Sequence, residues 1–209
     1  MARGPRKQSG NGLLSVDSVV INIYGGPGVG KSTTAAHLFY TLKSMGKTAE
    51  LVTEFAKELV WHHMGIDPQN PVYLSAELSD QLFIFAHQHR RILRLYGQVE
   101  YIVTDSPLVN SALYCPKDYP EEFIHLVMAM DRRFRQHNFL LERNPLMAYE
   151  DSGRCHTIHE SIKKDMEIRN IMTSAGIDFT TLENNEHTLG RIMGSIIDPS
   201  SVYPLPQIQ

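Results

Sequence analysis

The stretch from Gly25 to Ser32 constrains the fold of this chain more than any other. It reads GGPGVGKS and fits the pattern G-x-x-x-x-G-K-[ST]. An apolar, β-branched segment precedes it at residues 19–24, and helix-forming residues follow it at 32–43. A loop between a buried parallel strand and a helix is the setting in which this motif holds phosphate. The sequence therefore predicts a phosphate-binding strand–loop–helix unit, with a ligand-free glycine turn as the alternative.

The residue types of this loop suit the task. Glycine lets backbone N–H groups crowd around a phosphate, and the following helix N-terminus adds unpaired donors and a partial positive charge. Lys31 is expected to neutralise the β- and γ-phosphates of a nucleoside triphosphate, and the Ser32 hydroxyl is expected to ligate Mg²⁺. The expected nucleotide contacts are Gly25, Gly26, Pro27, Gly28, Val29, Gly30, Lys31, Ser32 and Thr33.

Length and composition indicate one globular α/β domain. The 209 residues are enough to bury a core, and 42% of them are hydrophobic and 21% charged. A formal net charge of −3 gives no general attraction to nucleic acid or membranes. The basic start lacks the apolar run of a signal peptide, and no segment approaches the ~20 apolar residues that span a bilayer. We expect no membrane partner and a cytoplasmic protein with reduced cysteines.

Strand-like and helix-like segments alternate along the chain. Strands are predicted at 19–24, 49–53, 101–104, 138–142 and 177–182, and helices at 32–43, 54–61, 75–96, 120–135, 156–176 and 186–197. This alternation is typical of a largely parallel sheet covered by helices on both faces. We expect a mobile basic arm at 1–18, one domain at 19–197 and a tail at 198–209. Apolar stripes are expected at Ala36, Phe39 and Leu42 and at Leu78, Leu82, Phe85, Ile92 and Leu95.

Acidic residues follow two predicted strands, at the sheet edge where ligands of α/β proteins gather. Asp105 is expected to hold Mg²⁺ through its waters, with helix capping as the alternative. Glu54 is expected to act as general base for an acceptor hydroxyl, or else to stabilise a helix N-terminus. Glu58, one turn later, is either a second acceptor contact or a solvated helix acid.

A polar stretch at residues 149–155 lies between a predicted strand and a predicted helix. Phosphoryl transfer needs positive charge around the migrating group and exclusion of water. We expect this stretch to be a lid in which Gly153 supplies a hinge and Arg154 is a catalytic residue that reaches the phosphate oxygens. A surface loop with a solvated arginine is the alternative, and Arg143 is a second candidate for the arginine.

Other polar residues are less specific. Gln81 and Gln88 share one face of the predicted long helix, where they either read the edge of an acceptor or are exposed polar residues. The ten histidines show neither H-E-x-x-H nor H-x-x-E-H, so no zinc site is expected. The cluster of Arg132, Arg133 and Arg135 is interpreted as a solvated helix end rather than a nucleic-acid patch.

Several motifs together resemble a known family. TEFAKEL at 53–59 and TDSPL at 104–108 follow the glycine-rich loop in order, and Gly153-Arg154 comes after them. Over about residues 18–197 the chain resembles small AAA-type P-loop kinases of the nicotinamide-riboside-kinase-like group, and phage-encoded members in particular. The resemblance implies a three-layer P-loop kinase fold, α/β with five parallel strands and a lid, and ATP with Mg²⁺ as phosphate donor. It places Lys31 and Ser32 at the donor phosphates and metal, Glu54 and Asp105 at the acceptor and metal, and Arg154 in the lid.

The resemblance also suggests an acceptor. Some phage members are implied to phosphorylate the hydroxymethyl group of 5-hydroxymethyluracil in double-stranded DNA, a step toward hypermodified thymidines in the host cytoplasm. We therefore expect an ATP-dependent kinase acting on a hydroxyl of a nucleoside-like acceptor, with this DNA base as first choice. A free nucleoside or nucleoside monophosphate is the alternative acceptor. A nucleotide-dependent switch or regulator with ATPase activity is the alternative class, although no N-K-x-D guanine signature occurs.

Overall fold

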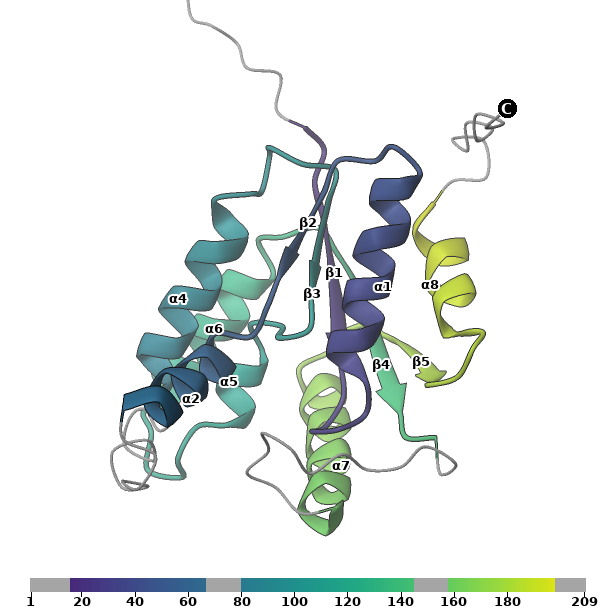
Figure 1. The fold of residues 1–209 in the computed structure, drawn as a ribbon. Helices are drawn as coiled ribbons and strands as arrows, with labels where there is room; N and C mark the ends of the chain where they lie inside the picture. The colour runs from purple at the N-terminus through teal and green to yellow at the C-terminus, as the bar shows by residue number, and fades with distance from the viewer. Residues whose placement is uncertain (1–15, 67–79, 145–157, 198–209) are drawn as a thin grey trace, which may run out of the picture.

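A computed structural model describes residues 16–66, 80–144 and 158–197. The chain forms one sheet of five parallel strands in the order β2-β3-β1-β4-β5 (Figure 1). The strands are β1 Val19–Tyr24, β2 Ala49–Val52, β3 Tyr101–Thr104, β4 Gln136–Glu142 and β5 Thr180–Glu183. The prediction of a five-stranded parallel sheet is confirmed. The predicted lid, most of the arm and the tail lie outside the described residues.

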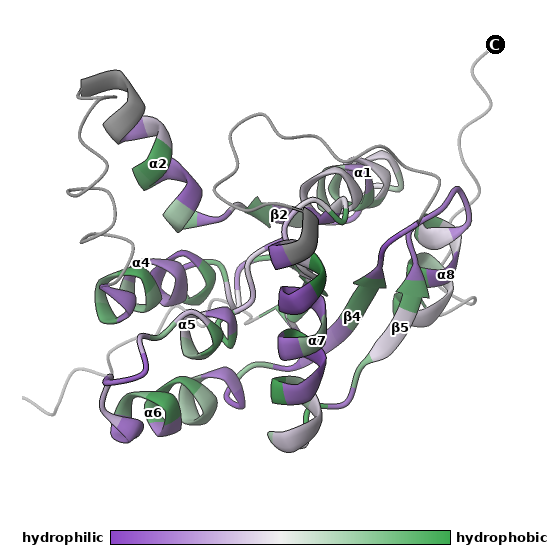
Figure 2. Cartoon of the chain, turned by 90° about the horizontal axis from the view of Figure 1, so that it is seen from below, coloured by the Kyte–Doolittle hydropathy of each residue, from purple (hydrophilic) through white to green (hydrophobic). Residues whose placement is uncertain are grey.

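Helices cover both faces of the sheet, as predicted. They are α1 Lys31–Ser44, α2 Phe55–Ile66, α4 Gln81–Leu93, α5 Asn110–Leu113, α6 Glu121–Asp131, α7 Ile158–Ser174 and α8 Thr188–Ile196. α1 and α8 lie on one face of the sheet, and α4, α5, α6 and α7 lie on the other (Figure 2). The buried apolar side chains of each group pack against the face that it covers. No helix within the described ranges is both long and apolar enough to cross a membrane.

β1 lies at the centre of the sheet and is buried along its whole length. It pairs with β3 on one side and β4 on the other, so both of its edges are hydrogen-bonded and both of its faces are covered. The loop that follows β1 therefore leaves from the middle of the sheet. Because all five strands are parallel, their carboxyl ends share one edge, where the loops after β1, β2 and β3 meet.

The buried faces of two helices differ from the predicted stripes. In α1 the buried residues are Thr34, Ala35, Leu38 and Leu42, whereas Ala36 is exposed. In α4, Leu82 is 52% exposed, and the buried residues are Gln81, Ile84, Phe85, Gln88 and Ile92. Both helices have polar side chains on their buried face. The buried face is therefore rotated about the helix axis relative to the stripe predicted from apolar residues alone.

Element boundaries also shift from the predictions. Asp80 accepts a hydrogen bond from the Phe83 N–H and caps α4, which begins at Gln81. β4 begins two residues earlier than predicted because Gln136 pairs with Val20 of β1. β5 begins at Thr180, three residues later than predicted, and the short helix α5 was not predicted.

Candidate nucleotide-binding site

The conformation of the loop between β1 and α1 requires glycine. Gly25, Gly28 and Gly30 all have positive φ, and Gly30, at 95°, is the N-cap of α1. A Cβ atom on Gly30 would lie 2.3 Å from Nδ2 of Asn184, so no other residue fits without a shift. The loop can therefore bring its backbone to a ligand without side chains in the way.

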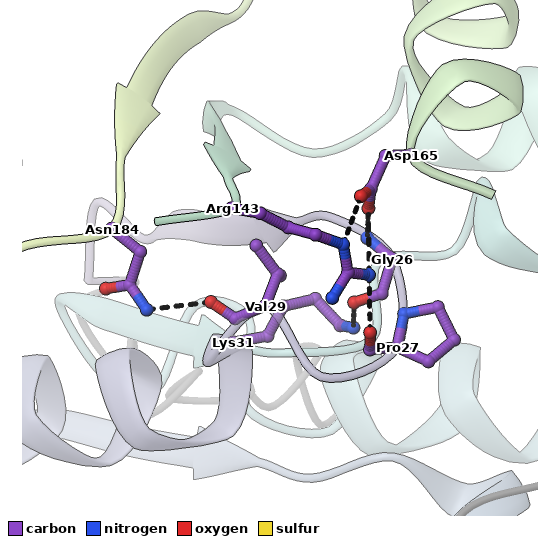
Figure 3. A network of polar contacts seen from close by, with 7 residues as sticks. All are labelled: Gly26, Pro27, Val29, Lys31, Arg143, Asp165 and Asn184. Carbon is purple, nitrogen blue, oxygen red and sulfur yellow. Dashed lines mark hydrogen bonds and ion pairs between the residues drawn. The ribbon is translucent and has the colours of Figure 1, made fainter. Parts of the chain in front are cut away.

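The end of the loop places cationic and polar groups at the N-terminus of α1. The Lys31 Nζ donates a hydrogen bond of 2.9 Å to the Gly26 carbonyl, so the side chain lies along the loop (Figure 3). α1 has no acidic residue in its first turn and no side-chain cap, and Ser32 and Thr33 are exposed there. The first N–H groups of a helix lack intrahelical partners, so this end attracts an anion.

Ser32 and Asp105 come together across the edge of the sheet. The Ser32 hydroxyl donates a 2.5 Å hydrogen bond to Oδ2 of Asp105, which is only 4% exposed. Among the described residues no donor reaches the other oxygen, Oδ1, although it is buried. A buried oxygen without a partner is costly, and Mg²⁺ prefers oxygen ligands. The residues present therefore fit a hydrated Mg²⁺ ion.

The helix-capping alternative for Asp105 is wrong. The next helix, α5, begins at Asn110, and its N-cap is Val109, which makes no side-chain capping bond. The carboxylate of Asp105 instead turns back to α1.

Glu54 lies between β2 and α2 and shares an electrostatic environment with Lys31 and Asp105. Burial raises the pKa of Glu54, and the nearby Asp105 carboxylate raises it further. The positive charges of Lys31 and Lys57 partly oppose this rise. A carboxyl group with a raised pKa beside a phosphate loop is a candidate proton acceptor. The fold thus brings together three residues that are far apart in the sequence.

Gln88 joins the two loops that carry Glu54 and Asp105. Its Oε1 accepts a hydrogen bond from the Phe55 N–H at 3.2 Å, and its Nε2 donates to the Ser106 carbonyl at 3.1 Å. Gln88 and Gln81 are 2% and 4% exposed, so the interpretation of exposed helix polar residues is wrong for both. The Gln88 amide holds the start of α2 against the end of β3.

Glu58 is engaged by an arginine. Both of its carboxylate oxygens accept hydrogen bonds of 2.5 Å from Arg91, and this pairing keeps the pKa of Glu58 below its usual range. The Arg91 guanidinium lies 4.9 Å from the centre of the Phe55 ring, which also stacks on His87 at 4.3 Å and meets Phe83 edge-on at 5.4 Å. Phe83 and His87 are exposed, so part of this aromatic group faces solvent.

Three side chains from distant elements hold the phosphate loop. Arg143 donates from Nη2 to the Pro27 carbonyl at 2.5 Å and pairs through Nε with Asp165 of α7. Asp165 accepts from the Gly26 N–H at 2.7 Å, and Asn184 donates to the Val29 carbonyl, also at 2.7 Å (Figure 3). Sequence reasoning missed Asp165 and Asn184, because nothing local to either residue indicates a contact with a loop more than 130 residues away. Arg143 is bound to the loop itself, and Gly153 and Arg154 lie outside the described residues.

Comparisons with solved structures find proteins of similar fold. NadR protein in complex with NR matches with a TM-score of 0.64 and 16% identity over 90% of this chain. Thymidylate kinase from Ehrlichia chaffeensis matches with a TM-score of 0.53 and 14% identity, covering 86% of this chain and 96% of its own. YorR protein from Bacillus subtilis, in complex with phosphorylated GDP, matches with a TM-score of 0.53 and 16% identity, covering 85% of this chain and 93% of its own. The chain spans 54% of the length of the NadR chain.

The sheet order, the helices on both faces and the loop after β1 define the P-loop kinase fold. No curated protein matches the chain in sequence. The chain belongs to the family described as AAA domain (AAA_28), whose model matches residues 20–188.

Proposed function

We propose that this protein is a kinase that transfers the γ-phosphoryl group of ATP to a hydroxyl group of a nucleoside-like acceptor. The observation that carries the proposal is the meeting of Lys31, Glu54 and Asp105 at the carboxyl edge of the sheet, where burial and Asp105 raise the pKa of Glu54. The similar structures add support, since one is a thymidylate kinase and the others were solved with NR and with phosphorylated GDP.

Each residue has a distinct part in the proposed reaction. The loop from Gly25 to Gly30 and the N-terminus of α1 bind the donor phosphates, and Lys31 balances their charge. Ser32 and Asp105 would hold Mg²⁺, which neutralises charge on the β- and γ-phosphates when bound. Thr33, in the first turn of α1, is a further nucleotide contact.

Glu54 acts on the acceptor. It takes the proton of the acceptor hydroxyl as the oxygen forms a bond to the γ-phosphorus, and the bond between that phosphorus and the bridging oxygen breaks to release ADP. Arg154, from the proposed lid, stabilises the charge that develops on the migrating group.

The contacts of Arg91 favour an acceptor without a terminal phosphate of its own. Recognition of an acceptor phosphate calls for a guanidinium that is available for two parallel hydrogen bonds. Arg91, beside the carbonyl of Thr53, already makes such bonds to Glu58. We therefore favour a nucleoside hydroxyl over a nucleoside monophosphate.

Within this class, the hydroxymethyl group of 5-hydroxymethyluracil in double-stranded DNA is our specific proposal for the acceptor. Its support is the pairing of TEFAKEL at 53–59 with TDSPL at 104–108, which resembles phage-encoded kinases. A free nucleoside is the competing acceptor. A base in a duplex would have to be flipped out to reach the loop.

The test is transfer of label from γ-labelled ATP with Mg²⁺. Hydroxymethyluracil-containing DNA, thymidine, deoxynucleoside monophosphates and nicotinamide riboside are offered in parallel, with Glu54→Gln as the inactive control. Labelling of the DNA or of a nucleoside identifies the acceptor. Release of inorganic phosphate with no labelled acceptor would overturn the kinase proposal in favour of a nucleotide-dependent switch.

A further inference from the structure

The back of the phosphate loop is held by a set of contacts that the proposed reaction does not use. Arg143, just after β4, and Asp165, on α7, form an ion pair whose side chains are 17% and 25% exposed. Each partner also makes one hydrogen bond to the loop, from Arg143 to the Pro27 carbonyl and from the Gly26 N–H to Asp165. Nearer the end of the loop, Asn184 donates to the Val29 carbonyl. Figure 3 shows these residues around the loop.

A neighbouring ion pair joins the same two elements without a described contact to the loop. Glu142, the last residue of β4, pairs with Arg169 of α7 at 2.6 Å. This pair joins the same two elements but is more exposed, with side chains 53% and 42% accessible, and neither residue has a described bond to the loop. The pair formed by Arg143 and Asp165 is the one that reaches the loop.

The close approach of Asp165 depends on the identity of residue 26. A Cβ atom at Gly26 would lie 2.2 Å from Oδ1 of Asp165 and 2.8 Å from the Ser161 carbonyl oxygen. Glycine therefore lets α7 approach the loop directly. A carboxylate so near a phosphate site would repel the phosphates, and the ion pair with Arg143 offsets that charge.

Because the peptide bond is planar, a hydrogen bond that fixes a loop carbonyl also fixes the orientation of the next residue's N–H group. In a trans peptide the C=O of one residue and the N–H of the next point in opposite directions. The bond from Arg143 fixes the Pro27 carbonyl, so the Gly28 N–H points away from the guanidinium. The bond from Asn184 likewise fixes the Val29 carbonyl, so the Gly30 N–H points away from Asn184.

We propose that Arg143, Asp165 and Asn184 are positioning residues for the donor triphosphate. Arg143 and Asn184 each hold one loop carbonyl outward and so orient the N–H groups of Gly28 and Gly30 toward the phosphates before the nucleotide arrives. Asp165 supports them by pairing with Arg143 and by accepting the Gly26 N–H. Donors that are already oriented lose less freedom on binding, so affinity rises without any direct contact between these side chains and the ligand. The proposal rests on the proposed function for the nature of the ligand.

The test compares Arg143→Met and Asn184→Leu with the matched control Arg169→Met. Binding of ATP with Mg²⁺ and of inorganic tripolyphosphate is measured by calorimetry, and steady-state kinetics give separate KM values for ATP and acceptor. We expect Arg143→Met and Asn184→Leu to weaken both ligands about tenfold or more and to raise the KM for ATP, with the KM for the acceptor changed less than about twofold. Arg169→Met should bind ATP as the wild type does. Arg143→Lys, which keeps a donor and a charge, should recover part of the affinity.

Equal binding of ATP by the wild type, Arg143→Met and Asn184→Leu would overturn the inference, and so would equal shifts in both KM values. Asn184 lies beyond β5 and not on α7, so its variant still tests the idea if loss of the ion pair prevents folding. Absence of ATP binding by the folded wild type would overturn both proposals. Weakened tripolyphosphate binding in the variants, together with no phosphoryl transfer to any acceptor, would overturn the proposed function and leave this inference standing.

Discussion

The Ser32 hydroxyl and the Asp105 carboxylate are joined by a 2.5 Å hydrogen bond across 73 residues of sequence. The bond links the first turn of α1 to the end of β3, the strand paired with β1. It leaves Oδ1 of Asp105 buried, with no donor among the described residues. Two oxygen-bearing side chains are therefore already placed for a cation before any ligand binds.

Asp105→Asn is expected to weaken Mg²⁺ activation. The substitution preserves shape but removes the negative charge, and loss of a group that holds a metal through its waters costs about 10–100-fold in affinity or activity. The check is the Mg²⁺ concentration that gives half-maximal turnover, with Asp131→Asn, a buried aspartate on α6, as control. An unchanged Mg²⁺ dependence in Asp105→Asn would show that this residue has no part in metal binding.

Glu54→Gln is expected to abolish turnover and to stabilise the fold at neutral pH. Because the folded-state pKa of Glu54 is raised, the unfolded chain loses this proton first as pH rises, and wild-type stability falls between the ordinary pKa of about 4.3 and the raised value. Glutamine has no proton to lose, so its advantage in Tm should appear above that window and vanish below about pH 4. Thermal unfolding at both pH values checks this.

The same shift predicts that wild-type kcat/KM rises with pH through the raised pKa of Glu54, since a general base must be ionised. The matched control is Glu50→Gln, an exposed acid on the preceding strand β2. If Glu50→Gln and Glu54→Gln altered activity and Tm alike, the special role of Glu54 would be lost.

Gly30→Ala is expected to impair both stability and nucleotide binding. A non-glycine residue at this positive φ costs about 1–3 kcal/mol, and the new Cβ would also overlap Asn184. Gly46→Ala is the control, because Gly46 has a φ of 75° and open space around its Cβ position, so it carries the backbone strain alone. Urea unfolding should show the larger loss for Gly30→Ala, and adding Asn184→Ala should restore part of it. Equal losses at both positions would mean that the loop tolerates a side chain.

Gln88→Leu is expected to destabilise the protein by about 1–3 kcal/mol, because it leaves the Phe55 N–H and the Ser106 carbonyl without their partner. The displacement of Glu54 relative to Asp105 should lower kcat more than it raises the KM for ATP. Gln88→Glu adds a negative charge near both acids and should move the rise in kcat/KM to higher pH. Arg94→Gln, at an exposed position after α4, should change neither the stability nor kcat. A Gln88→Leu protein with wild-type kcat would contradict the positioning role.

Local sequence patterns predicted the framework of the fold. The apolar run of β1, the glycine-rich loop and the regular alternation of strands and helices each depend on neighbouring residues. The rule that ligands gather at the carboxyl edge of parallel strands then brought Glu54 and Asp105 together, as the structure shows.

Buried polar residues were the main failure, because in sequence they look the same as exposed ones. Asn22 lies inside β1, yet its Nδ2 donates to Gln136 at 2.6 Å and to Asn138 at 2.8 Å on β4. Gln88 is buried in the same way, and the half-buried Asp165 resembles both, since their partners lie on other elements. Only the assembled sheet reveals which polar side chains have partners that make burial acceptable.

The long-range support of the phosphate loop affects how the protein matures. The bonds from Asp165, Arg143 and Asn184 reach the loop across 139, 116 and 155 residues. During synthesis, the loop is complete when the ribosome has released little more than residue 30, but its last support arrives only after β5 has emerged. Closing loops of this length costs chain entropy before the contacts form, so we expect these contacts to form late in folding. Nucleotide binding should therefore appear as one of the final events in folding and should act as a reporter of a finished molecule.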